Sequence, residues 1–280
     1  MFLISSGQKP DSIDGLQRIL GGGLNLSFQV NDGAQRIQAT GTWPDIDRLT
    51  VNLTGLALDP LRPPPAPDGL NPSAGESWGR YGQLTIQAAP LRLAPAGRLF
   101  LEVHASGVDF VMTADRQNRC WFTPSSLDSG HVEARISGKD LEHVFLENAT
   151  QAAAAHGVTV EEGRLQMRQT GPQQLQVSAE LTARKLFVKG SISLEGNLEL
   201  DEQLNLHFSG LDCSGQGMIG SIATRFLHPH LAAWNQRSFP LLANILPSVR
   251  LHHVELQTGN DGQIRATARV GGTGKARIAQ

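Results

Sequence analysis

Apolar and polar residues alternate along much of this chain, as they do in strands with one buried face and one solvated face. The alternation predicts about a dozen strands, because one-sided strands of this kind are typical of antiparallel sheets. The predicted strands lie within residues 24–30, 49–58, 84–86, 99–103, 108–112, 132–136, 158–160, 165–167, 175–181, 186–188, 192–194, 198–208, 249–256 and 264–270.

Two stretches in the first part of the chain have apolar residues at helical spacing. Residues 11–20 begin with an Asp-Ser cap and predict a short helix, stopped by the glycine run 21–23. Ser137 and Asp140 form a variant of the capping box ahead of a second helix that Gly157 ends. The second half of that helix is rich in alanine, which leaves room for a close neighbour or a guest molecule.

A third helical region is expected over about 218–246 from its helical spacing. Pro229 removes one helix hydrogen bond and should kink this helix. A restart is expected at Ser238 and a stop at Pro247. The fold class expected from the pattern is α+β, mostly antiparallel β, with long curved strands wrapped around a helix.

The chain is expected to form a single domain over 1–280. Residues 60–80 are rich in proline, which cannot donate to a strand ladder, so a loop or an insertion is expected there. Residues 271–280 are glycine-rich and basic, and are expected to fray.

Composition narrows the function classes. The chain has 280 residues, a formal net charge of −2 and 5% aromatic residues, which disfavours binding to nucleic acid. Cys120 and Cys213 match no metal or redox spacing, so two buried free thiols are expected. The opening Met1–Ile4 is too short for a signal segment. The expected location is therefore the cytoplasm or the cytoplasmic membrane surface, or the cell envelope if the chain has been trimmed.

The motifs of chemistry are weak. Residues 215–220 read G-x-G-x-x-G before a helix, but no acidic residue occurs between Asp212 and Glu255 and no βαβ unit precedes them. A plain strand-to-helix turn is the expected structure. The histidines near 228–230 and 252–253 have no nearby acidic or thiol partner to complete a metal site. No nucleophile elbow, zinc or phosphate-loop sequence is present, so no catalytic residues, metal or cofactor are expected.

Three stretches together resemble a known family. Asp45–Asp59 resembles the strand "l-x-v-x-l-x-g-v-x-l-d" of the LmeA-like bacterial lipid-binding proteins, which belong to the TULIP superfamily of BPI-like folds. Val132–Leu141 resembles that family's strand running into a "t-x-x-D-L" helix start. Leu241–Val270 resembles its closing helix and final two strands. The proline-rich stretch departs from the family pattern.

The resemblance implies a curved sheet rolled around a long helix, with an apolar groove for acyl chains. The implied function is binding, with transfer as an extension, of a phospholipid or fatty-acyl ligand by a protein that is not an enzyme and touches membranes peripherally. The acyl contacts expected on the helices are Leu141, Val144, Phe145, Phe226, Leu231, Trp234 and Leu241. The basic tail, with Lys275 and Arg277, is the expected headgroup contact.

Two alternatives stay open. A structural or protein-interaction scaffold would fill the sheet with its own side chains. A lipid-modifying enzyme would need a polar constellation at the mouth of the groove. The pattern does not indicate the oligomeric state.

Overall fold

The computed structural model describes most of the chain. The described residues are 2–4, 7–58, 65, 68, 75–94, 96–154, 157–185, 187–201, 205–235, 238–240, 249–259 and 262–272. Their elements, in order, are β1 (Phe2–Leu3), α1 (Ile13–Phe28), η1 (Gly33–Arg36), β2 (Ile37–Thr42), β3 (Asp45–Asn52), β4 (Ala57–Leu58), β5 (Glu76–Leu93), β6 (Gly97–Ala114), β7 (Cys120–Ser126), β8 (Ser129–Ser137), α2 (Gly138–Ala154), β9 (Thr159–Gly171), β10 (Gln174–Lys185), β11 (Val188–Leu200), β12 (Asn205–Gln216), α3 (Gly217–Trp234), β13 (Ser238–Pro240), β14 (Val249–Thr258) and β15 (Gln263–Gly272).

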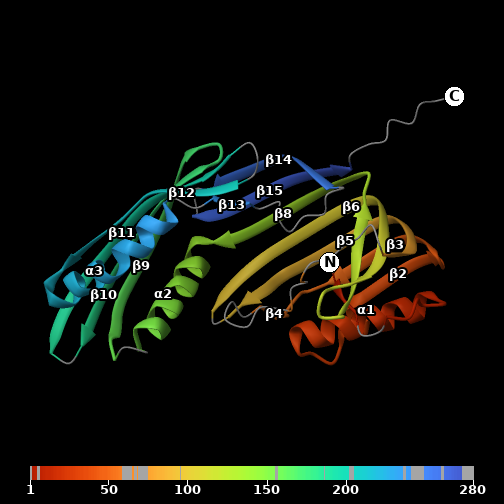
Figure 1. Ribbon diagram of the computed structural model, residues 1–280, viewed down its shortest axis with the longest axis horizontal. Coiled ribbons are helices and arrows are strands. Elements are labelled where there is room, and N and C mark those ends of the chain that lie inside the picture. Colours follow the sequence, from red (N-terminus) through yellow and green to blue (C-terminus); the bar gives the residue numbers. More distant parts are fainter. Residues whose placement is uncertain are drawn as a thin grey trace.

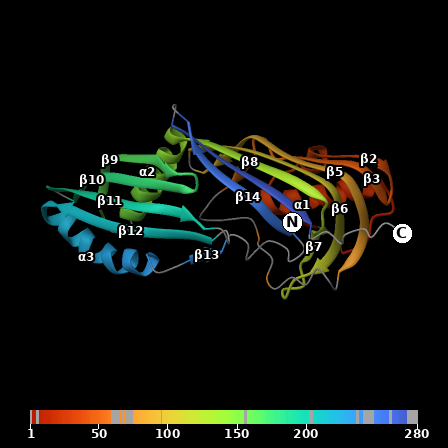
Figure 2. The same cartoon turned by 90° about the horizontal axis from the view of Figure 1, so that it is seen from above.

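The fold is α+β and mostly antiparallel, with 61% strand and 22% helix, which confirms the class expected from the alternation. The described strands form a ten-stranded sheet whose main path is β14-β15-β8-β6-β5-β3-β2, and a five-stranded sheet β13-β12-β11-β10-β9. Among the described strands, only the pairings of β3 and β4 with β5 are parallel. Figures 1 and 2 show the two sheets at opposite ends of an elongated molecule, with α1 beside the first sheet and α2 and α3 beside the second.

Strand β6 joins two predicted strands into one of 18 residues. Its first half pairs with β8 and its second half with β7, a strand that the pattern did not predict. Gly107 lies at the change of partner with φ +56°, and a Cβ there would fall 1.9 Å from the carboxylate of Asp128. Glycine therefore allows one strand to serve two neighbours.

Helix α1 does not stop at the glycine run, so the predicted helix end and the predicted strand over 24–30 are both wrong. Ser12 caps its start, and the helix continues through the glycines to Phe28. A Cβ at Gly21 would lie 2.4 Å from the backbone of Ala34, and one at Gly23 would lie 1.7 Å from the carbonyl oxygen of Leu3. The glycines are thus contact points where neighbouring backbone approaches the helix.

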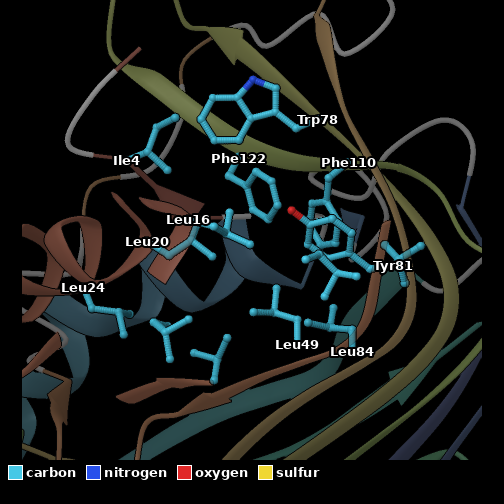
Figure 3. Packing of buried hydrophobic residues seen from close by; sticks show 14 residues of the cluster. Ile4, Leu16, Leu20, Leu24, Leu49, Trp78, Tyr81, Leu84, Phe110 and Phe122 are labelled. Carbon is cyan, nitrogen blue, oxygen red and sulfur yellow. The ribbon is translucent and has the colours of Figure 1, made fainter. Parts of the chain in front are cut away.

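The core beside α1 is densely filled. Leu16, Leu20 and Leu24 pack from α1 onto the sheet, as Figure 3 shows, and their side chains are at most 4% exposed. An aromatic cluster lies at one end, where the rings of Phe110 and Phe122 stack at 4.1 Å between centroids. Four aromatic side chains are fully buried at this end of the molecule: Trp78, Tyr81, Phe110 and Phe122.

Two further expectations need correction. Strand β5 begins at Glu76, so the predicted loop over 60–80 is too long at its C-terminal end; long antiparallel pairing with β6 continues the strand to that point. Helix α3 ends at Trp234, and Ser238–Pro240 form strand β13 instead of a helix restart, because they pair with β12. Residues 241–248, including Leu241 and Pro247, and the tail 273–280 lie outside the described residues. Cys120 and Cys213 are both free, the first half-buried and the second buried.

Candidate functional site: an apolar face and a cleft between two sheets

The ten-stranded sheet carries apolar rows that run across several strands. Leu99 of β6 lies opposite Ile136 of β8, which lies opposite Ile264 of β15. The next row crosses Leu101, Ala134, Ala266 and Leu256, and the next crosses Val103, Val132, Ala268 and Val254. We call these three rows the inner face.

Burial changes along this sheet. Side chains of β3 that pack on α1, such as Leu49 and Val51, are completely buried. All residues of the inner face are only half-buried. The apolar surface of the sheet therefore extends beyond the part that its core fills.

Side-chain amides from β9 and from the β9–β10 turn connect the second sheet to β14 of the first. Gln169 Nε2 donates to the carbonyl oxygen of Leu256 at 3.0 Å, and its Oε1 accepts from Thr258 N at 3.2 Å. Gln173 Nε2 donates to the carbonyl oxygen of Val254 at 2.9 Å. We call this contact the glutamine bridge, and it places the edges of the two sheets side by side.

A cleft of about 320 Å³ lies next to this junction. Leu165 and Met167 line it from β9, Ile264 lines it from β15, and Leu141 lines it from α2. Its other lining residues are Gly138, Gln166 and Gly262. We call it the junction cleft. Its described lining carries one polar side chain, that of Gln166, and no charged side chain.

The start of α2 positions Leu141. Asp140 N donates to Ser137 Oγ at 3.0 Å, which confirms the predicted cap, and Arg98 Nε donates to the Asp140 carboxylate at 3.1 Å. Gly138 N donates to the carbonyl oxygen of Gly262 at 2.9 Å, so the helix start is tied to the β14–β15 turn. A side chain at Gly138 would meet that carbonyl at 2.8 Å.

The electrostatics of this helix start favour an ionised Asp140. Burial works against ionisation, but the hydrogen bonds from Ser137 and Arg98 outweigh it and hold the pKa of the Asp140 carboxyl below its ordinary value. The negative charge of Asp140 is thus held by the cap of α2, and the next residue, Leu141, lines the cleft.

The other residues expected on α2 lie apart from the cleft lining. Val144 packs over Gly97 at the start of β6, where a Cβ would lie 2.5 Å from Val144 Cγ2. Leu146, which the pattern did not single out, packs over Gly163 and Leu181 of the second sheet. Phe145 is half-buried.

The residues expected on the third helix are only partly described. Leu231 is half-buried on α3, while the side chains of Phe226 and Trp234 lie outside the description, as does Leu241. Of the seven expected acyl contacts, the described lining of the junction cleft includes Leu141 alone. The strand residues Leu165, Met167 and Ile264 belonged to predicted strands, but alternation alone could not say which inward positions border open space.

The G-x-G-x-x-G stretch is the turn from β12 into α3, as predicted. Gly217 begins the helix with φ +76°. A Cβ at Gly215 would lie 2.3 Å from the carbonyl oxygen of Gly220, and one at Gly220 would lie 2.4 Å from that of Ser191. The glycines therefore let the helix pack closely on β11 and β12, which run antiparallel.

Comparison with known proteins gives no family for this chain, so its function is argued from the fold and the site alone. No family model, no curated protein and no solved structure matches the chain. Among the described residues, no three His, Cys, Asp or Glu side chains gather where they could hold a metal ion. No helix in the described part has both the length and the apolar character needed to cross a bilayer.

Proposed function

We propose that this protein binds a phospholipid or another acyl-chain lipid, without catalysis, on the inner face and in the junction cleft. We further propose that it is a lipid-binding protein of the LmeA-like type, with its long sheet curving around a helix. The observation that carries the proposal is the set of half-buried apolar rows that meet an uncharged cleft.

The dimensions and energetics are consistent with such a ligand. Small-molecule sites usually occupy about 300–1,000 Å³, and the cleft of about 320 Å³ lies at the lower end of that range. Transfer of an acyl chain from water is favourable by about 0.8 kcal/mol per methylene, so a sixteen-carbon chain offers on the order of 12 kcal/mol before ordering costs. No specific polar motif is needed for affinity of this kind.

The long strands support the proposed architecture. Strands β5 and β6 each have 18 residues, and they bend across the molecule in Figure 1. The apolar stripe of α1 packs against the same sheet. A curved sheet leaves its far end free to hold a ligand once α1 has filled the near end.

Native mass spectrometry with lipid extraction tests the proposal. We expect near-stoichiometric lipid on the purified protein, or after incubation with mixed liposomes. The double variant Leu141→Asn/Ile264→Asn should lose lipid at least tenfold, because it places two amides in the cleft lining. The control His143→Asn/Thr267→Asn changes the exposed side of α2 and the opposite face of β15, and should keep wild-type occupancy.

A self-filled scaffold is the second candidate, and the densely packed core beside α1 favours it. A wild-type protein that is free of lipid, and stays so with liposomes, would rule out lipid binding and leave the scaffold as the better account.

A further inference from the structure

A second apolar surface lies far from the core, at the end of the five-stranded sheet. Among the described residues, five large hydrophobic side chains are exposed, and the three most exposed are Phe187 at 100%, Ile222 at 65% and Met218 at 60%. Phe187 lies in the β10–β11 turn, and the other two lie one turn apart on α3. Exposure of this degree on neighbouring elements indicates a contact surface.

The three side chains lie at the same end of the molecule. Gly217, which precedes Met218, packs against the backbone of Lys189 and Gly190, immediately beyond the β10–β11 turn. Figures 1 and 2 show this turn and the start of α3 together at the end farthest from α1. We call this region the distal tip.

The packing of α3 on the sheet keeps the side chains of Met218 and Ile222 exposed. The helix rests on the sheet through Gly220 and Thr224, whose carbonyl oxygen accepts a hydrogen bond from Cys213 Sγ at 3.8 Å. Turning the helix to bury Met218 and Ile222 would push side chains into a contact that glycine alone fits. The apolar pair is therefore held outward.

Basic side chains surround the distal tip. Arg184 and Lys189 flank the β10–β11 turn, and both bind Glu161, at 3.1 Å and 2.8 Å. Lys185 lies at the end of β10, and Arg225 is exposed on α3 beyond Ile222. The cations outnumber the nearby carboxylates, Glu161 and Glu162, so the tip is complementary to an anionic partner.

We propose that the distal tip inserts into the surface of an anionic bilayer. Phe187, Met218 and Ile222 would enter the boundary between headgroups and acyl chains, while the basic side chains meet lipid phosphates. The inference rests on the proposed lipid-binding function and names the surface that meets the membrane. It differs from the basic C-terminal tail expected from the pattern.

The size of the patch favours a membrane over a protein. A stable protein interface buries about 800 Å² on each partner, more than three protruding side chains supply. A bilayer needs no matching shape, and binding to it grows with buried apolar area and with attraction to anionic lipid.

Vesicle flotation tests this inference. Wild-type protein should float with vesicles of phosphatidylcholine and phosphatidylglycerol, and at least tenfold less with phosphatidylcholine alone or at 0.5 M salt. The triple variant Phe187→Ser/Met218→Ser/Ile222→Ser should bind anionic vesicles at least tenfold more weakly. Leu26→Ser is the matched control, because Leu26 is 59% exposed at the opposite end of the molecule and should have no effect.

A second readout shows insertion directly. The variant Phe187→Trp should add a fluorescence component that shifts to shorter wavelength with anionic vesicles and is quenched by brominated acyl chains. Wild-type binding by the triple variant, absence of wild-type flotation, or a triple variant that only disrupts a dimer in sedimentation would each overturn the inference. Native mass spectrometry of the triple variant separates the two proposals, since its cleft is intact and should still hold lipid.

Discussion

At the scale of single residues, glycine has two different structural roles in this chain. In α1 the glycines lie inside a helix and accept the backbone of β1 and η1 at distances that a Cβ would forbid. At Gly107 and Gly217 the glycines supply positive φ at a change of strand partner and at a helix start. The same residue type therefore predicts a helix end only when no distant backbone occupies the space that it leaves.

Two glycine substitutions in α1 should have opposite effects on stability. Gly23→Ala should lower the free energy of unfolding by about 1–3 kcal/mol, because its methyl group would collide with Leu3 and overpack the site. Gly22→Ala, on a half-buried position of the same helix, should raise it by about 0.5–1 kcal/mol through helix propensity. Urea unfolding measures both, and equal shifts in one direction would contradict the close contact.

At the scale of elements, the turn between β6 and β7 depends on one buried carboxylate. Asp115 accepts hydrogen bonds from Trp121 Nε1 at 3.0 Å and from Arg119 through both its backbone N and its guanidinium. Burial opposes its ionisation, but these bonds outweigh burial and hold the pKa of Asp115 well below its ordinary value. The side chain thus organises the turn that β7 needs to pair with β6.

The stability that Asp115 contributes should depend on pH. A lowered folded-state pKa means that this stability is present above the unfolded value of about 3.9 and is lost as pH falls toward the folded value. Asp115→Asn should therefore lower the urea midpoint clearly at pH 7, and the difference from wild type should narrow below pH 4. Asp45→Asn, an exposed change at the start of β3, is the control; a constant gap for Asp115→Asn from pH 7 to pH 2.5 would contradict the assignment.

At the scale of the whole molecule, the glutamine bridge joins the edges of the two sheets, and residues of both sheets line the junction cleft beside it. Among the described residues, three hydrogen bonds made by side-chain amides link β14 to β9 and to the β9–β10 turn, where no backbone ladder joins the two sheets. Each such bond contributes about 0.5–1.5 kcal/mol net. Far fewer hydrogen bonds therefore cross the described junction than join the strands within either sheet.

Loss of the glutamine bridge should loosen one sheet edge selectively. In Gln169→Ala/Gln173→Ala, the amides of β14 should exchange hydrogen at least tenfold faster, while those of β10 and β11 stay at wild-type rates. Gln176→Ala, an exposed change on β10, is the control. Uniform acceleration in both sheets would indicate general destabilisation, and unchanged β14 exchange would show that the bridge is not needed.

Prediction from the chain succeeded where a structure depends on neighbours in sequence. Alternation located most strands, since the side-chain period of two is a local property. The cap at Ser137 and Asp140 and the turn at Gly217 were found in the same way. Among the residues that line the junction cleft, the sequence had singled out Leu141 as a contact residue. It had also predicted that the strands carry an inward apolar face.

The remaining features depend on contacts between residues far apart in the chain. Helix α1 continues through its glycines because the backbone of Leu3 and Ala34 packs against them. Strand β6 is long because its two halves pair with different strands, β8 and β7. Which apolar rows are filled and which border a cleft depends on where α1 and α2 pack. The sequence shows which residues are hydrophobic and therefore favour burial. The atoms that bury them come from other elements, so the burial of each residue at the site is decided only by the assembled fold.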